Sequence, residues 1–234
     1  MKRYLITGAS SGIGKTCTEN LLEQGNDVIA VSRSVPSITN ERLVHFECDL
    51  SLPGSGIKLV EKLKDRKLLP IDGVVHCAGV APLLKISENE LEKVEGAYEV
   101  NLFSFIDIMD TLKNRGGYCK GTKIVVLSSV VSSRGSNRQS LYAGTKAALE
   151  EVVRCYAESI EDVRINAIVS GAVRTDMLQK LEAESPGLED RMKKYYPLGV
   201  IDVEKIWEAV EFLLSDKSDI INGVCFPYDS GYLL

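Results

Sequence analysis

The sequence predicts an α/β fold in which a doubly wound parallel sheet of about seven strands carries helices on both faces. Short apolar segments alternate with helical segments along the chain, which is typical of parallel strands joined by crossover helices. A glycine-rich turn, residues 8–14, lies between the first apolar segment and the first helical one. Residues 123–128 are almost wholly apolar, as expected of a strand buried on both faces. Together these features indicate a Rossmann-type fold.

Size and composition place the chain among ordinary globular proteins. Its 234 residues are predicted to form one domain, residues 1–234. Hydrophobic residues make up 44% and charged residues 26%, which is typical of a chain with a large core. The net charge of −5 argues against a nucleic-acid or anionic-membrane partner. We find no run of about 18 apolar residues, and the N-terminus enters a predicted strand at once, so we expect neither a membrane span nor a signal peptide.

The cysteines and histidines exclude two further classes of protein. Six cysteines are spread along the chain without a Cys-x-x-Cys pair, and only two histidines accompany them. This is neither a zinc pattern nor a disulfide framework. We therefore expect reduced cysteines, no metal site and a cytoplasmic location.

Each predicted element follows from its local pattern. Apolar, β-prone runs predict strands at residues 4–7, 27–32, 43–46, 72–76, 123–128, 163–169 and 223–227. Pro227 is expected to end the last strand outside the ladder. Helical patterns predict helices at residues 15–25, 56–67, 88–114, 141–160 and 203–214. Residues 176–196 are charged and contain a Pro-Gly step, and they predict one or two mobile helices within a substrate lid, residues 176–200.

The glycine-rich turn has the context that a dinucleotide site needs, because a strand precedes it and a helix follows it. Gly8 permits a tight turn. Gly12 lets backbone N–H groups approach a pyrophosphate at the helix N-terminus, and Gly14 lets helix and strand pack closely. The alternative is an ordinary connection between a strand and a helix.

Two residues after the second and third strands bear on the choice of cofactor. An acidic residue after the second strand favours NAD, whereas an arginine can pair with a 2′-phosphate. Ser32 and Arg33 stand there, so the sequence favours NADP(H) and makes NAD(H) less expected, unless Arg33 is simply solvated. Asp49 can accept a hydrogen bond from an adenine amino group, or it can cap the next helix.

Tyr142 and Lys146 are four residues apart and share one face of a predicted helix. A phenol has a pKa of about 10, and a neighbouring ammonium group lowers it, so such a pair can act as a general acid and base. The alternative is a helix start with a half-buried tyrosine and a solvated lysine. Asn101 lies in the middle of the predicted helix 88–114, where it is either solvated or opens the helix and holds a water.

Taken together, these motifs resemble the short-chain dehydrogenase/reductase family over essentially the whole chain. Ser129 lies thirteen residues before Tyr142, a separation typical of that family. The residues that carry the resemblance are Thr7 to Gly14, Asp49-Leu50, Cys77-Ala78-Gly79, Asn101, Ser129, Tyr142 with Lys146, and Gly171 with Thr175. The chain departs from the family pattern at two positions, with Cys77 in place of an asparagine and Ser170 in place of a proline.

The resemblance implies a role for each site residue. Ser129 would bind the substrate oxygen, Tyr142 would exchange a proton with it, and Lys146 would lower the tyrosine pKa and hold the nicotinamide ribose. Asn101 would position a water that connects Lys146 to solvent. The implied cofactor contacts are Gly8, Ser10, Ser11, Gly12, Ile13, Gly14, Arg33, Asp49, Leu50, Ala78, Gly79, Tyr142, Lys146, Gly171, Val173 and Thr175.

The expected activity is hydride transfer between NADP(H) and a carbonyl or secondary alcohol. Members of the family reduce 3-oxoacyl thioesters, sugars, steroids and small ketones, and the resemblance is to the 3-oxoacyl-[acyl-carrier-protein] reductase type. Leu178, Leu181 and the pair Tyr195-Tyr196 either line an apolar pocket or pack the lid helices. Two alternatives are an NADP(H)-binding sensor with little turnover and another reaction on this scaffold, such as epimerisation or dehydration. The family usually forms homotetramers through the helices that correspond to residues 88–114 and 141–160, so we expect a homotetramer or a dimer.

Overall fold

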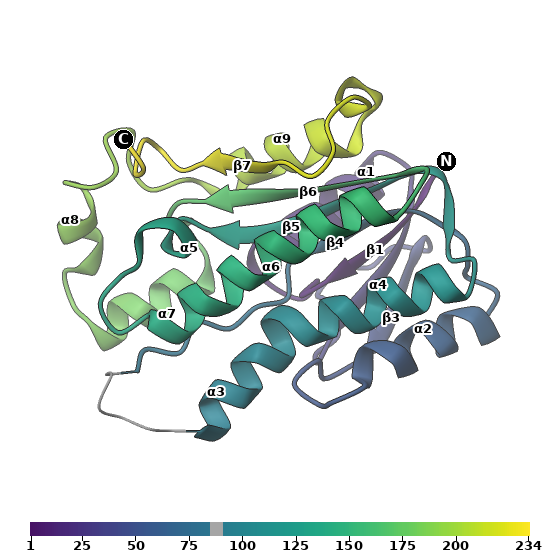
Figure 1. Ribbon diagram of the computed structural model, residues 1–234, viewed down its shortest axis with the longest axis horizontal. Coiled ribbons are helices and arrows are strands. Elements are labelled where there is room, and N and C mark those ends of the chain that lie inside the picture. Colours follow the sequence, from purple (N-terminus) through teal and green to yellow (C-terminus); the bar gives the residue numbers. More distant parts are fainter. Residues whose placement is uncertain (85–90) are drawn as a thin grey trace.

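A computed structural model describes residues 1–84 and 91–234 and confirms the predicted fold class (Figure 1). All seven strands of its sheet run parallel in the order β3-β2-β1-β4-β5-β6-β7. The order reverses beside β1, which is where doubly wound sheets bind ligands. The strands are β1 (Arg3–Thr7), β2 (Asp27–Ser32), β3 (Leu43–Glu47), β4 (Ile71–His76), β5 (Tyr118–Ser129), β6 (Val163–Ser170) and β7 (Cys225–Tyr228).

Helices cover both faces of the sheet and bury two apolar cores. In Figure 1, α2 (Ser55–Asp65), α4 (Ser104–Asn114) and α6 (Ser140–Ser159) lie in front of the sheet, and α1 (Gly12–Glu23) lies behind it. Helix α9 (Val203–Leu214) packs against α1 on the rear face. Phe105, Ile108 and Leu149 belong to the front core, whereas Leu21 and Trp207 belong to the rear core. None of the helices in the described part of the chain is long and apolar enough to cross a membrane.

Two strand predictions need correction. The structure starts β5 at Tyr118 instead of residue 123, because its polar first half pairs with β4 across an irregular register at Ile71 and Gly73. Pro227 lies inside β7, opposite Val169, and does not end the strand outside the ladder. The carbonyls of Val224 and Tyr228 accept hydrogen bonds from Ala167 of β6 and from Gly171, which follows β6. The period of two therefore places the Pro227 nitrogen on the open edge, where no donor is needed.

The long helix predicted over residues 88–114 is interrupted in its middle. Residues 88–90 fall outside the described part of the chain. Beyond them, α3 (Leu91–Tyr98) runs into a π-helical turn, Glu99–Phe103, and then into α4. Asn101 lies in that turn and is fully buried, which confirms that the helix opens locally at this residue.

The carboxyl ends of the strands face one side of the molecule. In Figure 1 the arrowheads of β5, β6 and β7 point toward the side where α7 (Asp176–Glu184) and α8 (Leu188–Met192) lie. Two helices therefore form within residues 176–196, as predicted. Their position places them beside the edge of the sheet that carries the predicted site residues.

Candidate active site

A cleft of about 780 Å³ opens at the carboxyl ends of the strands. Its wall includes every residue that was predicted to contact the cofactor, from Gly8 on the loop after β1 to Thr175 before α7. Ser129 lines the same cleft, whereas Asn101 does not. The fold thus brings residues from distant segments of the chain to one site.

The glycine-rich turn forms a cradle that side chains would fill. Gly8 has a φ of +69°, and a Cβ at Gly14 would lie 2.3 Å from the carbonyl oxygen of Gly8. Helix α1 begins at Gly12, and the side chain of its N-cap residue, Ser11, forms no capping hydrogen bond. Its first N–H groups therefore face the cleft with positive partial charge. These residues fit the pyrophosphate of a dinucleotide.

The end of β2 offers a positive charge and no carboxylate. Arg33 is exposed and lines the cleft. Ser32 precedes it and is held inside the fold, because its hydroxyl donates to the carbonyl of Ser34 at 2.8 Å and lies 3.1 Å from Nε2 of His45. As expected, His45 itself lies in the sheet, on β3.

Asp49 does not cap the following helix. Its Oδ1 accepts hydrogen bonds from the backbone N–H of Ser51 at 3.0 Å and from the Ser51 hydroxyl at 2.7 Å, while α2 starts later, after Gly54. These two bonds lower the pKa of the Asp49 carboxyl, and the charge of Arg33 adds to the effect. The carboxylate is therefore ionised beside the cleft.

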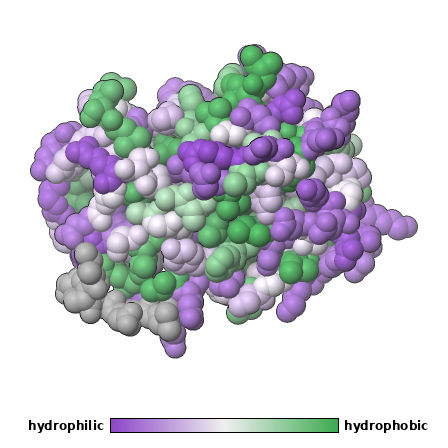
Figure 2. Space-filling view, viewed as in Figure 1, coloured by the Kyte–Doolittle hydropathy of each residue, from purple (hydrophilic) through white to green (hydrophobic). Residues whose placement is uncertain are grey.

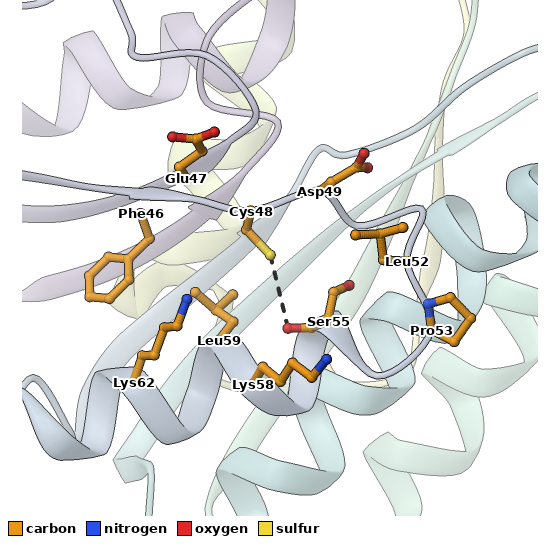
Figure 3. Close-up of a pocket in the computed structure, with 10 residues that line it drawn as sticks. All are labelled: Phe46, Glu47, Cys48, Asp49, Leu52, Pro53, Ser55, Lys58, Leu59 and Lys62. Carbon is orange, nitrogen blue, oxygen red and sulfur yellow. Dashed lines mark hydrogen bonds between the residues drawn. The ribbon is translucent and has the colours of Figure 1, made fainter.

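Cys48 and Asp49 also border a smaller pocket of about 170 Å³ between the end of β3 and α2 (Figure 3). The thiol of Cys48 lies 3.9 Å from the carbonyl of Ser55. Lys58 and Lys62 extend from α2 along the side of this pocket opposite Asp49. The small pocket is thus a neighbour of the large cleft.

Ser129, Tyr142 and Lys146 converge inside the cleft. Tyr142 and Lys146 lie on α6, and Ser129 is the last residue of β5. The Tyr142 and Ser129 hydroxyls are hydrogen-bonded to each other. The Lys146 ammonium lies 5.9 Å from the centre of the Tyr142 ring, and it donates to the carbonyl oxygen of Leu127 at 2.7 Å.

The expected effect of Lys146 on the tyrosine is wrong in this arrangement. Burial raises the pKa of Tyr142 to about 12, and the hydrogen bond with Ser129 opposes that rise. Burial also lowers the pKa of Lys146 to about 8, although Cys77 and Glu150 oppose the fall. Desolvation dominates because Lys146 is buried and Tyr142 is half-buried in the wall of the cleft.

Asn101 acts as a clamp between two segments. Its Oδ1 accepts a hydrogen bond from the N–H of Val80 at 2.8 Å, and its Nδ2 donates to the Val80 carbonyl and to the Thr145 hydroxyl, both at 2.9 Å. Thr145 in turn donates to the carbonyl of Tyr142 at 2.8 Å. A Cβ at Gly79 would lie 3.5 Å from Oδ1 of Asn101 and 3.6 Å from Nζ of Lys146, so the clamp sits close to the lysine.

The two departures from the family pattern have local partners. The Ser170 hydroxyl donates to the carbonyl of Ser128 at 3.1 Å, which ties the turn after β6 to the end of β5. Cys77 lines the cleft, and its thiol contacts the buried thiol of Cys17. Both side chains are integrated into the fold.

Thr7 and His76 hold the centre of the sheet, a role that the sequence interpretation assigned to neither residue. The hydroxyl of Thr7 accepts a hydrogen bond from the N–H of Ala78 at 3.1 Å and lies 3.0 Å from Nδ1 of His76. Thr7 and His76 thus join the ends of β1 and β4, where the family usually has an asparagine side chain. Thr7 was part of the motif that carries the resemblance, but neither its role nor that of His76 had a signal of its own, because a threonine and a histidine in apolar strands fit many roles.

The outer wall of the cleft has an apolar part. Of the two alternatives for Leu178 and Leu181, the structure shows them lining the cleft, together with Met177 of the same helix, while Asp176, Lys180 and Glu184 add charged groups to this wall. Tyr196 lines it too, but Tyr195 does not. The Tyr195 ring instead packs near Tyr232 and the guanidinium of Arg134.

Comparisons with known proteins agree with this geometry. A profile of the family described as Enoyl-(Acyl carrier protein) reductase matches residues 8–233. L-xylulose reductases of Bos taurus and Homo sapiens are both 32% identical to the chain, over 245 and 243 residues, and each alignment covers 99% of this chain and 96% of the relative.

Solved structures share the whole fold. A short chain dehydrogenase family protein from Francisella tularensis subsp. tularensis SCHU S4 matches with a TM-score of 0.92 at 26% identity, over 100% of this chain and 99% of the other. A 4-hydroxyisoleucine dehydrogenase complexed with NADH matches with a TM-score of 0.90 at 25% identity, over 99% and 98%. The chain therefore belongs to the short-chain dehydrogenase/reductase family of NAD(P)-dependent oxidoreductases.

Proposed function

We propose that the protein is an NADP(H)-dependent carbonyl reductase or alcohol dehydrogenase. The observation that carries this proposal is the convergence of Ser129, Tyr142 and Lys146 on the cleft that contains the glycine cradle. A proton donor and a dinucleotide cradle in one cleft are what carbonyl reduction needs. A sensor with little turnover would need the cradle but not the proton donor.

The residues of the chain can prepare the substrate and supply the proton. When bound, the nicotinamide supplies hydride to the carbonyl carbon. The Ser129 hydroxyl binds the carbonyl oxygen, and Tyr142 donates its proton to that oxygen. With its pKa raised to about 12, the phenol is in the proton-donating form at neutral pH. The Lys146 ammonium then balances the negative charge that the tyrosine is left with.

Two features support the choice of cofactor and substrate. The position of Arg33 in the cleft wall supports NADP(H), since a guanidinium can bind a 2′-phosphate through paired hydrogen bonds. The apolar wall formed by Met177, Leu178 and Leu181 supports a carbonyl substrate with a hydrocarbon arm, such as a 3-oxoacyl thioester. We propose residues 176–200 as the lid that covers such a substrate.

A substrate panel tests the proposal. NADPH or NADH is mixed with 3-oxoacyl thioesters, small ketones and L-xylulose, and turnover is followed by the nicotinamide absorbance. We expect reduction with NADPH, and Tyr142→Phe should lower kcat by about 100-fold or more because the proton donor is lost. Tyr156→Phe is the matched control, since Tyr156 lies on the same helix, outside the cleft wall, and bonds to Asp110.

Two outcomes would contradict the proposal. Turnover that persists unchanged in Tyr142→Phe would mean that this phenol is not the proton donor. Tight NADPH binding with no turnover on any carbonyl would favour the sensor.

A further inference from the structure

Glu150 is a buried carboxylate one helical turn from Lys146, and the reaction proposed above leaves it without a role. Glu150 is only 6% exposed and Lys146 only 4%. The two residues are four positions apart on α6, so their side chains lie on the same face of the helix. A positive and a negative group are thus buried on the same face of α6, although the structure describes no direct ion pair between them.

Both groups are anchored on the last residues of β5. The Lys146 ammonium donates to the carbonyl of Leu127 at 2.7 Å, and the Ser128 hydroxyl donates to a carboxylate oxygen of Glu150 at 2.5 Å. Leu127 and Ser128 are consecutive, and Ser129 follows them. The Glu150 carboxylate is therefore fixed beside the end of β5. The same strand end carries Ser129 and the Leu127 carbonyl to which Lys146 donates.

Burial of one charge is costly unless an opposite charge compensates it. Burial lowers the pKa of Lys146 to about 8, and the Glu150 carboxylate acts in the opposite direction. Among the described residues, Glu150 is the carboxylate that raises this pKa. Without it, the lysine would lose its proton at a lower pH.

Other titratable groups also surround the pair. His76, the last residue of β4, and Cys77, which follows it, interact with Lys146, and Tyr142 lies on the same helix as Lys146. Cys225 of β7 and Arg154 of α6 interact with Glu150. Arg154 forms its ion pair with Glu151 at the surface, at 2.8 Å, so it does not replace the Lys146 ammonium as the buried cation.

We propose that Glu150 is a positioning residue of this reductase: held by Ser128, its carboxylate is the counter-ion that keeps Lys146 charged and seated on the end of β5. It acts through Lys146 and does not itself touch the substrate. The inference rests on the proposed function, because it gives Glu150 a task in that reaction.

The test measures the charge of Lys146 directly. The protein is labelled with ¹³C-lysine, the ε-carbon signal of Lys146 is assigned by its loss in Lys146→Arg, and the signal is titrated by NMR. We expect Glu150→Gln to lower the titration midpoint of Lys146 by about half a pH unit or more. Glutamine keeps the shape and can still accept the Ser128 hydrogen bond, so only the charge is removed.

Glu151→Gln is the matched control, because it removes the same charge from the next residue, which is exposed and paired with Arg154. The titration midpoint of Lys146 in Glu151→Gln should equal that in the unaltered chain. Glu150→Asp should restore most of the midpoint, since it keeps the charge. If Glu150→Gln does not fold, Glu150→Asp is used for the test. We then expect the titration midpoint of Lys146 to lie below that of the unaltered chain by a smaller amount.

A second readout is the pH profile of kcat for ketone reduction. Its alkaline limb should move to lower pH in Glu150→Gln and stay in place in Glu151→Gln. An unchanged NMR midpoint in Glu150→Gln, or an equal shift in Glu151→Gln, would overturn the inference even if the enzyme reduces ketones. If Glu150→Gln lowers the Lys146 midpoint but the protein reduces no carbonyl, the effect of Glu150 on the charge of Lys146 is confirmed and the proposed reaction is refuted.

Discussion

Arg33 is the residue on which the proposed preference for NADP(H) over NAD(H) is based. Its side chain is exposed on the cleft wall, and it forms no hydrogen bond or ion pair with any side chain that the structure describes. Its guanidinium donors are therefore available to an incoming phosphate. Asp49 lies close enough for Arg33 to lower its pKa, and that carboxylate already accepts two hydrogen bonds from Ser51.

Arg33→Ala should weaken NADPH much more than NADH. Loss of charged hydrogen bonds worth about 1.5–3 kcal/mol predicts a Kd for NADPH that is roughly tenfold or more higher. The measurement is fluorescence titration of both cofactors. Arg42→Ala is the control, because Arg42 is partly exposed and pairs with Asp27 at 3.7 Å outside the cleft. Equal losses for NADPH and NADH would refute the cofactor assignment.

At the scale of residues, the sequence predicted the cleft wall well because glycines and chain order constrain it. The glycine cradle follows from the turn itself, where a side chain at Gly14 would meet the carbonyl of Gly8. Glu150 was not identified, although its spacing of four from Lys146 places it on the same helix face and distinguishes it from Glu151. The sequence does not show that this face packs against the end of β5 and is buried there. The rise of the Tyr142 pKa was not predicted either, because the desolvation of its phenol has no sign in the sequence.

The π-helical turn is the element on which the site depends most. It turns Asn101 inward so that one amide binds the backbone of Val80 and the hydroxyl of Thr145. The loop after β4 and the start of α6 are therefore linked through one side chain. A helix without this turn would point the same residue elsewhere.

Asn101→Ala should lower the free energy of unfolding by about 2–4 kcal/mol, because it leaves the N–H and C=O of Val80 and the Thr145 hydroxyl without their partner. Urea unfolding measures the loss. Asn20→Ala is the control: Asn20 also donates to a backbone carbonyl, that of Thr16 at 2.9 Å, but within a surface helix. We expect its effect to stay within about 0.5 kcal/mol. Similar losses of unfolding free energy in Asn101→Ala and Asn20→Ala would contradict the proposed role of Asn101 in linking the two segments.

At the scale of elements, apolar strands were predicted well and polar ones poorly. Strand β2 and helix α9 have the predicted bounds, because their apolar periods are clear. The first half of β5 was missed, since Lys120 and Gly121 give no strand signal. Neighbouring segments hold this half in place, because Tyr118 pairs with Ile71 of β4 and the Gly121 N–H donates to the carbonyl of Asp162 before β6. Pro227 was misplaced because an edge strand tolerates it. The motion of α7 and α8 as a lid remains a prediction.

The face of the molecule that α4 and α6 cover bears on assembly. Figure 2 shows hydrophobic residues gathered across the middle of this face, with hydrophilic residues around them. Tyr98 and Val100 beside α4, and Val152 and Tyr156 on α6, are only partly buried there. These are the helices through which the homotetramer is expected to form. The assembly stays a prediction, and sedimentation of the purified chain would test it.

The sheet as a whole depends on a neutral histidine at its centre. His76 is 1% exposed, and burial lowers its pKa to about 3, with the charge of Lys146 as the second cause. Its Nε2 has no partner among the described residues, so a proton there would be a buried charge without compensation. Between about pH 3 and pH 6.5, the unfolded chain binds a proton at this residue and the folded chain does not.

Stability should therefore fall as the pH drops from 6.5 toward 3. One proton contributes a slope of about 1.4 kcal/mol per pH unit, so His76 should account for roughly 2 kcal/mol of the loss between pH 7 and pH 5. His76→Asn keeps an amide near the Thr7 hydroxyl and removes the titrating group, and it should reduce this loss in urea unfolding at the two pH values. His45→Gln, which changes the only other histidine, should keep the loss because His76 remains. If His76→Asn lost as much stability on acidification as the unaltered chain, the acid sensitivity would have to come from the carboxylates and not from the centre of the sheet.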